Sequence, residues 1–242
     1  MTDVSLTTEP RPDRNLVAPV WHTVLFLVFL GFYALFEVGR VARLEASHSS
    51  SRLPQYLFMI CFELAIVGYV WLGLRPGGTT LARLIGGKWR RWTDVLRDIG
   101  IAFLFWLLVV VFLIGARFAF GRDELSLRAV RILAPRGAIE MIAWCMVAIA
   151  AGVCEEIVFR GYLQRQFLAV TGRTSFAIVL QAVIFGTAHT YKGYRGMITI
   201  AIYGALFGVL AVRRKSLRPG IMQHTGQDVL AGLAANLLSK GA

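Results

Sequence analysis

Two adjacent carboxylates, Glu155 and Glu156, stand at the end of an apolar segment in the stretch AGVCEEIVFRGYLQR. An α-helix advances by about 100° per residue, so Glu156 and Arg160 share one helix face at ion-pair spacing. Glu155 points elsewhere, and a carboxylate without a cation in a low dielectric can exchange protons near neutral pH. The spacing therefore predicts a neutralised Glu156 and a reactive Glu155. An ion pair that only anchors a helix end explains Glu156 and Arg160 equally well.

Two histidines occur in the apolar segments that follow. His189 ends the run Phe185-Gly-Thr-Ala-His189, and His224 lies four residues before Asp228, so that both project from one helix face. Either histidine alone is explained by a hydrogen bond that joins buried helices. Polar groups scattered over separate apolar helices would each lose hydration without a partner. Their recurrence in three successive segments therefore predicts one shared polar site.

Three further acids lie in apolar segments, where ionisable residues are functional candidates. Glu37 and Glu140 stand at segment ends, from which a carboxylate reaches the headgroup region. Glu63 lies deeper and has no partner nearby in the sequence, so it is a weaker candidate for the site.

The motifs EExxxR, FxxxH and Hxxx[N/D] occur in this order, with 34 residues between Glu155 and His189. This triple resembles the signature of the CPBP intramembrane proteases, which include type II CAAX prenyl endopeptidases and bacterial Abi-type proteins. The resemblance covers about residues 140–235. Asp228 departs from the eukaryotic type II CAAX enzymes, which carry Asn there. It is therefore open whether this position donates a hydrogen bond to an oxyanion or only accepts one.

The resemblance implies an endopeptidase that cuts a peptide bond near the terminus of a membrane-associated or prenylated substrate. Glu155 with His189 would activate a water, and His224 would position it or stabilise the oxyanion. Four positions would support these groups. Asp228 would orient His224, the pair of Glu156 and Arg160 would hold the helix, and Phe185 would pack nearby.

Metal dependence stays open at this point. His189 and His224 with one carboxylate form an acceptable zinc set with an open position, so zinc is expected only if the enzyme is metal-dependent. The HExxH motif is absent, and a metal-free glutamate mechanism is equally compatible. Neither GxSG nor GxGD occurs, which argues against intramembrane serine and aspartyl proteases.

Two other classes of function remain. A membrane scaffold or bacteriocin-immunity-like protein of the same fold would act through contacts without proteolysis. A proton-coupled transporter also uses intramembrane Glu and His, but the sequence shows no inverted repeat of broken helices.

The composition predicts an all-α, polytopic transmembrane helix bundle of about seven to eight spans. The 242 residues are 57% hydrophobic and only 17% charged, and the mean hydropathy is +0.62. Soluble domains are about 45–50% apolar and about 25% charged. The candidate spans are residues 20–36, 54–74, 98–120, 139–159, 174–190, 197–212 and 217–238.

Three regions are expected along the chain. Residues 1–18 form a flexible polar tail, residues 19–138 form variable transmembrane helices with basic linkers, and residues 139–240 form the catalytic core. Trp89 and Trp92 mark one linker as interfacial. Gly204 and Gly208 have the spacing of closely packed helices.

The net charge of +12 comes from 26 Lys and Arg against 14 Asp and Glu. The basic residues lie mainly between apolar segments, where they meet lipid headgroups and orient the spans. A lipid bilayer is therefore the expected partner, and nucleic acid is not. Loop charges favour a cytoplasmic N-terminus in the inner membrane, while the oligomeric state stays open. The three cysteines show neither disulfide nor zinc-site spacing.

One geometric condition follows from helix lengths. Glu155 and His189 each lie about 22–24 Å from the start of their segments, so simple antiparallel neighbours would hold them at different depths. The site requires a helix that continues past Arg160 towards Phe167. Glu155 would then lie below the membrane surface in a water-accessible cavity.

Overall fold

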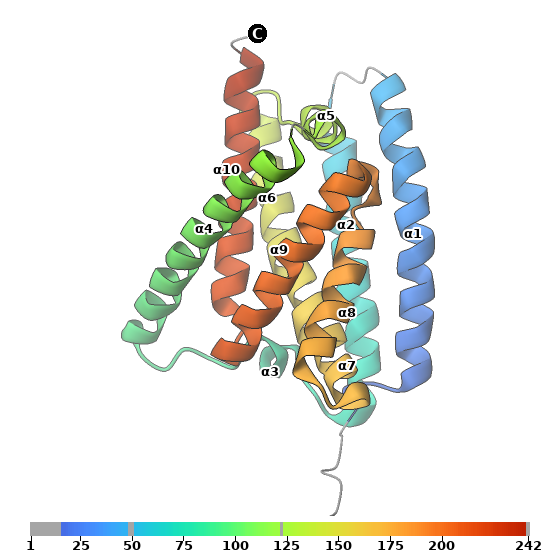
Figure 1. The fold of residues 1–242 in the computed structure, drawn as a ribbon, viewed down its shortest axis with the longest axis vertical. Coiled ribbons are helices and arrows are strands. Elements are labelled where there is room, and N and C mark those ends of the chain that lie inside the picture. Colours follow the sequence, from blue (N-terminus) through green and yellow to red (C-terminus); the bar gives the residue numbers. More distant parts are fainter. Residues whose placement is uncertain (1–15, 48–50, 122, 241–242) are drawn as a thin grey trace, which may run out of the picture.

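The computed structural model describes residues 16–47, 51–121 and 123–240, which are helical and contain no strand. The predicted tail falls mostly on residues 1–15, outside this part. The helices form one bundle (Figure 1). They are α1 (Val20–Ala46), α2 (Leu53–Leu74), η1 (Arg75–Gly77), α3 (Leu81–Ile85), α4 (Trp92–Phe120), α5 (Glu124–Leu133), α6 (Ala138–Glu155), η2 (Glu156–Leu163), α7 (Gln164–Thr171), α8 (Thr174–Thr187), η3 (Thr190–Lys192), α9 (Gly193–Arg214) and α10 (Arg218–Lys240).

The all-helical membrane architecture is confirmed, whereas the predicted seven to eight spans are not. Within the described residues, five helices are long and apolar enough to cross a bilayer. Helix α8 has only 14 residues. Helix α10 has 23 residues but carries Gln223, His224, Gln227 and Asp228 along its length. The polar residues that build the site therefore lower the hydropathy of the helix that carries them.

Helices α6, η2 and α7 form one continuous helix of 34 residues, Ala138–Thr171. The predicted continuation past Arg160 is confirmed. Gly172, with a φ of 68°, donates its N–H to Leu168 O at 2.8 Å and ends the helix. The chain then reverses into α8. Glu155 lies 16 residues before this reversal and His189 15 residues after Thr174, about 22–24 Å along each helix. The two residues therefore reach similar depths.

The middle of this continuous helix is a π-helix, η2. A π-helix carries one more residue per turn than an α-helix and often occurs at functional sites. All eight of its residues are buried. Helical periodicity alone did not predict this change of winding.

A dense apolar core closes the end of the bundle that holds α3 and the N-terminus of α10. Its fully buried members include Leu84, Val158, Tyr162, Leu163 and Leu217. Many apolar side chains on the outer faces are exposed, as lipid contact requires.

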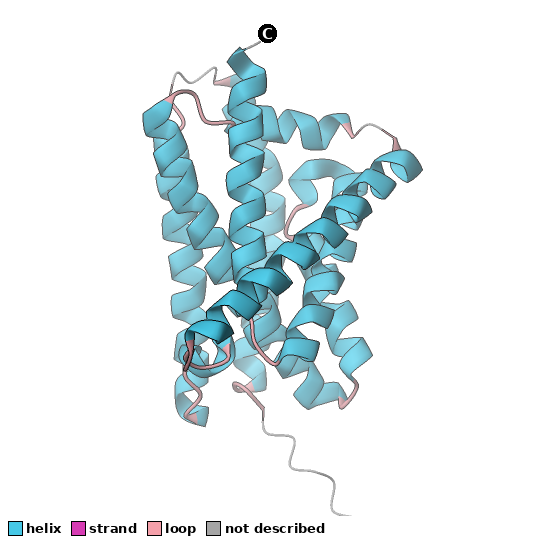
Figure 2. Cartoon of the chain, turned by 90° about the vertical axis from the view of Figure 1, so that its left-hand side faces the viewer, coloured by secondary structure: helices cyan, strands magenta, loops and turns pink. Residues whose placement is uncertain are grey.

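The opposite end of the bundle is crossed by the short helix α5, and α4 leans across the bundle to reach it (Figures 1 and 2). The Asp123 side chain accepts the N–H of Ser126 at 3.2 Å and caps α5. Arg128 forms an ion pair with Glu45 of α1. Ala129 and Leu133 face inward. Helix α5 therefore covers the space beneath it with its apolar side.

Small residues allow α9 to approach α8 closely. A Cβ atom on Gly204 would lie 2.8 Å from Cδ1 of Phe185, and one on Gly208 would lie 2.7 Å from Oε1 of Gln164. The prediction of close packing at Gly204 and Gly208 is confirmed.

The acids at segment ends make local contacts. Glu37 forms an ion pair with Arg40. Glu140 accepts the backbone N–H groups of Arg52 and Arg136, each at 2.7 Å. Glu37 thus pairs within α1, whereas Glu140 joins the start of α2 to the start of α6.

Candidate active site

The pair of Glu156 and Arg160 is closed and buried, as the spacing predicts. Oε1 of Glu156 lies 3.0 Å from Nη1 of Arg160, and the two side chains are 1% and 0% exposed. The guanidinium lies 4.3 Å from the ring centroid of Phe185 and 5.0 Å from that of Phe207. Nη2 of Arg160 also donates to Gly204 O at 3.2 Å. The ion pair, the cation–π contacts and one hydrogen bond thus hold the buried charge.

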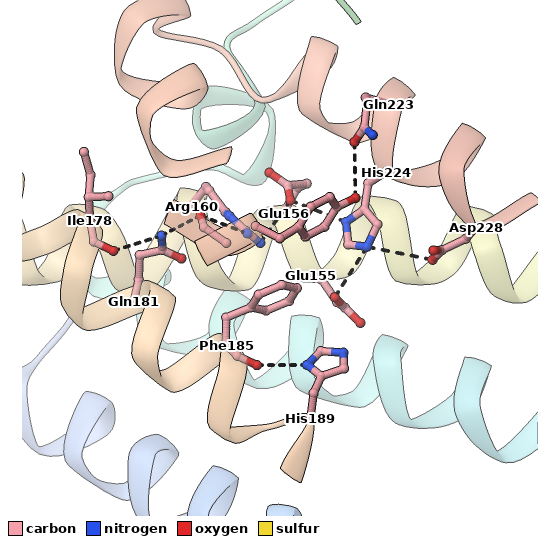
Figure 3. A network of polar contacts seen from close by, with 12 residues as sticks. Glu155, Glu156, Arg160, Ile178, Gln181, Phe185, His189, Gln223, His224 and Asp228 are labelled. Carbon is pink, nitrogen blue, oxygen red and sulfur yellow. Dashed lines mark hydrogen bonds and ion pairs between the residues drawn. The ribbon is translucent and has the colours of Figure 1, made fainter. Parts of the chain in front are cut away.

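His224 of α10 stands between three carboxylates (Figure 3). Its Nε2 lies 3.7 Å from Oε2 of Glu155 and 3.8 Å from Oδ2 of Asp228. Its Nδ1 lies 3.5 Å from Oε1 of Glu156. Both ring nitrogens face carboxylate oxygens, and only an imidazolium donates from both. The geometry therefore favours His224 as a cation.

His189 follows the end of α8, and its tautomer is set by one contact. Nδ1 lies 2.8 Å from Phe185 O, which can only accept, so Nδ1 carries the proton. Nε2 of the neutral ring is then an acceptor. The Phe185 ring packs 4.9 Å from the His189 ring and 6.4 Å from the His224 ring. Phe185 thus separates and orients the two histidines.

A cavity of about 390 Å³ joins these groups and extends beneath α5. Its polar lining includes Glu155, His189, His224 and Asp228, and most of the remaining wall is apolar. Because its apolar residues come from α5, α6, α9 and α10, the site is enclosed by helices that are far apart in the sequence. Of the seven residues expected at the site, Glu156 and Arg160 lie behind it and five line it.

Several polar atoms at the site keep unused hydrogen-bonding capacity. Oε2 of Glu155 and Nδ1 of His224 are buried and have no hydrogen-bond partner within the described part of the chain. The separations of 3.5–3.8 Å around His224 exceed a normal hydrogen bond. The charges attract one another, but these atoms stay available to a water or a substrate.

The donor geometry does not fit a zinc site. Among the described residues, no group of three or more His, Cys, Asp or Glu side chains is arranged to hold a metal ion. His189 keeps Nε2 as an acceptor, but both ring nitrogens of His224 face carboxylate oxygens. The arrangement gives no support to a metalloprotease, and we derive no step through a metal.

Sequence patterns missed several residues around the site. Tyr191, Lys192, Tyr203 and Gln227 line the cavity, and Lys192 could have been found by its place three residues after His189. Glu63 of α2, isolated in the sequence, lies within electrostatic range of Glu155 and Asp228.

His22 has a structural role. It shares a hydrogen bond of 2.9 Å with the hydroxyl of Tyr162 and one of 3.0 Å with Tyr69 O. These contacts join α1 to α2 and η2, away from the cavity.

Fold and site together define a helical integral membrane protein in which Glu155, His189, His224 and Asp228 line one internal cavity. Residues 137–230 match the family model of the Rce1-like type II CAAX prenyl endopeptidases. Over these residues the chain is similar to the CPBP/CAAX protease family, and the resemblance noted from the motifs is confirmed. Searches of curated proteins and of solved structures gave no match.

Proposed function

We propose that the protein is an intramembrane endopeptidase that uses Glu155 and His189 to activate a water. One observation carries the proposal. A carboxylate of α6, an imidazole after α8 and a His–Asp pair of α10 face the same enclosed cavity. These are the groups that amide hydrolysis needs: a proton acceptor, a second acceptor for the water and a donor for the oxyanion.

The proposed reaction assigns each proton. Glu155 accepts a proton from the water, while Nε2 of His189 accepts the other water hydrogen in a hydrogen bond. The hydroxide oxygen bonds to the carbonyl carbon, and His224 donates to the oxyanion that forms. When the C–N bond breaks, Glu155 returns its proton to the leaving amine. Asp228 stabilises the charged His224, and the closed pair of Glu156 and Arg160 fixes the helix.

The proposed substrate is the terminal part of a membrane-associated or prenylated peptide. The cavity wall is mainly apolar and lies inside a membrane bundle. Such a wall accepts aliphatic side chains and excludes bulk water around the reacting bond.

We also propose that the end bearing the N-terminus faces the cytoplasm of an inner membrane. Segments 75–91, 172–173 and 213–218, at this end (Figure 1), hold ten Lys and Arg and no acidic residue. Segments 47–52, 121–137 and 188–193 hold six Lys and Arg and two acidic residues. An excess of basic residues marks the cytoplasmic side. The cavity beneath α5 then lies toward the opposite side.

The test is cleavage of a fluorogenic peptide set by the purified protein, with each peptide made with and without a farnesylated cysteine. We expect Glu155→Gln to lower kcat by at least about a thousandfold, since it removes the proton acceptor. Glu45→Gln, at the exposed ion pair with Arg128, is the matched control and keeps the wild-type rate. Full activity of the Glu155→Gln protein would refute the mechanism. Failure of the wild-type protein to cut any peptide would refute the proposed function.

A further inference from the structure

A groove of about 450 Å³ lies outside the candidate active site, where α4 slants across α10 (Figure 2). Its walls are apolar apart from two side chains, Trp106 and Gln223. Gly226 opens the middle of the groove, because a Cβ atom there would meet nothing within 4 Å. Phe103 and Leu230, on the two walls, are 57% and 47% exposed. The groove therefore opens toward the lipid and not toward the cavity beneath α5.

The two polar side chains of the groove each keep an unused hydrogen-bond donor. Oε1 of Gln223 accepts the hydroxyl of Tyr203 at 3.3 Å, but Nε2 of this buried side chain has no hydrogen-bond partner among the described residues. Nε1 of Trp106 is likewise buried and unpartnered there. A buried donor without an acceptor costs free energy, and a bilayer core offers no bulk water to supply one. The groove therefore favours an occupant that is mainly apolar and carries acceptor oxygens.

The end of the groove near the start of α10 adjoins a cluster of charges. Arg218 stands four residues before Met222, which lines the groove, and Asp98 directly precedes the lining residue Ile99. Asp98 forms ion pairs with Arg218 at 2.9 Å and with Arg214 at 3.5 Å. Two guanidinium groups share one carboxylate, so the cluster has an excess of one positive charge.

Arg218 is held in place with donors to spare. Its guanidinium lies 5.2 Å from the ring centroid of Trp89, and the indole of Trp89 donates to Oδ2 of Asp98 at 2.9 Å. Nη1 of Arg218 is buried and has no hydrogen-bond partner within the described part of the chain. Segments 75–91 and 213–218, which adjoin this end, contain no acidic residue. The surroundings therefore attract an anion to this arginine.

We propose that the groove between α4 and α10 binds one anionic phospholipid. Its phosphate meets the guanidinium of Arg218, an ester carbonyl accepts from Gln223, and an acyl chain lies along Gly226 and Leu230. Basic pockets between spans are suited to anionic headgroups. The inference is independent of the proposed endopeptidase.

The spacing along α10 suits such a lipid. Gln223 follows Arg218 by five residues, an axial rise of about 7.5 Å, and the ester groups of a phospholipid lie a few bonds below its phosphate. Leu230 lies roughly 10 Å further along the helix, a depth that the acyl chains of one leaflet reach in a hydrocarbon core about 30 Å thick. Phosphate, ester and chain thus meet a cation, a donor and an apolar wall in the right order.

The experiment is native mass spectrometry of the purified full chain in detergent, titrated with dioleoylphosphatidylglycerol or with zwitterionic dioleoylphosphatidylcholine. We expect one anionic lipid per chain, bound at least about tenfold more tightly than the zwitterionic one, as a charge-assisted hydrogen bond allows. Arg218→Gln removes the anion contact and Gly226→Leu fills the groove, so each should weaken this binding by about tenfold or more. Arg213→Gln, which removes an exposed cation next to Arg214, is the matched control and should change it by less than about twofold.

Thermal unfolding keeps the test independent of folding defects. Each variant is first melted without lipid, and Gly226→Leu leaves the charge cluster intact. Because a ligand of the folded state raises the melting temperature, phosphatidylglycerol should stabilise the wild-type protein and Arg213→Gln. It should stabilise Arg218→Gln and Gly226→Leu much less.

Several outcomes would overturn the lipid site. Equal affinity for the two lipids, or equal losses in Arg213→Gln and Arg218→Gln, would show general attraction to a basic surface. Full binding by Gly226→Leu, or equally tight binding of inorganic phosphate, would reduce the site to the charge cluster alone. Displacement of the lipid by a farnesylated peptide would assign the groove to a substrate, and a dimer that excludes lipid would assign it to a second copy of the chain.

Discussion

Glu155 and Glu156 are neighbours in the sequence, yet they end in opposite surroundings. Glu156 is 1% exposed, pairs with Arg160 at 3.0 Å and adjoins the dense core below η2. Glu155 is 14% exposed, lines the cavity and has its nearest charged partner at 3.7 Å. One carboxylate is fixed, and the other is left free to react.

The difference shows how a membrane bundle can hold a reactive carboxylate. A buried ion pair with good hydrogen bonds is costly to break but chemically idle. A carboxylate held by looser contacts can take up and release a proton during a reaction. Placing both on one continuous helix lets the fixed pair set the position of the reactive group.

Removing Arg160, the cation of the buried pair with Glu156, should have the largest effect on stability. Arg160→Met leaves the buried Glu156 without its partner, and breaking such a pair costs about 3–5 kcal/mol. The measurement is denaturant or thermal unfolding of the purified protein in detergent. Arg128→Met is the matched control, because its pair with Glu45 is exposed and should be worth less than about 1 kcal/mol. Equal stability losses in the two variants would show that the buried pair of Glu156 and Arg160 stabilises the protein no more than an exposed ion pair does.

The contact between Glu155 and His224 depends on the close approach of α6 and α10, which Gly152 permits. A Cβ atom there would lie 2.8 Å from the backbone N of Thr225, next to His224. Gly152→Ala should therefore push His224 away from Glu155. We expect a loss of about 1–3 kcal/mol in stability and a loss of at least tenfold in kcat, because small displacements of reacting groups are costly.

The control for this prediction is Gly226→Ala, two residues beyond His224. A Cβ atom on Gly226 meets nothing within 4 Å, and alanine favours a helix by up to about 1 kcal/mol over glycine. This variant should keep full activity. Equal rates for Gly152→Ala and the wild-type protein would show that His224 need not approach Glu155.

Local spacing predicted part of this site, and tertiary packing decided the rest. The pair of Glu156 and Arg160 follows from helix periodicity, and the extension of the helix follows from the depth of His189. The π-helix η2 has no signal in helical periodicity, and its residues pack against Leu84 and Leu217, which lie far away in the sequence. Helix α5 is short and basic, so it resembled a linker. Residues 217–238 were expected to span the membrane, but the polar residues of α10 keep this helix out of the five that are apolar enough to do so.

Asp228 is the most exposed of the three carboxylates around His224. It is 34% exposed and lies 3.8 Å from His224, so its charge should add less than about 1 kcal/mol. Asp228→Asn keeps the shape, and we expect kcat/KM on the best peptide to fall by about fivefold or less. A thousandfold loss would place Asp228 in the chemistry itself, whereas a gain in rate would show that an amide donor serves the oxyanion better.

The smallest effect is expected from a zinc chelator. Phenanthroline should change the cleavage rate by less than about twofold, since three zinc ligands in suitable geometry do not occur among the described side chains. The non-chelating isomer of phenanthroline is the control for effects on the detergent or the peptide. Metal analysis of the purified protein provides a second reading. Stoichiometric zinc, with activity lost to the chelator and restored by zinc, would replace the glutamate mechanism and would mean that His189 and His224 move together when the metal binds.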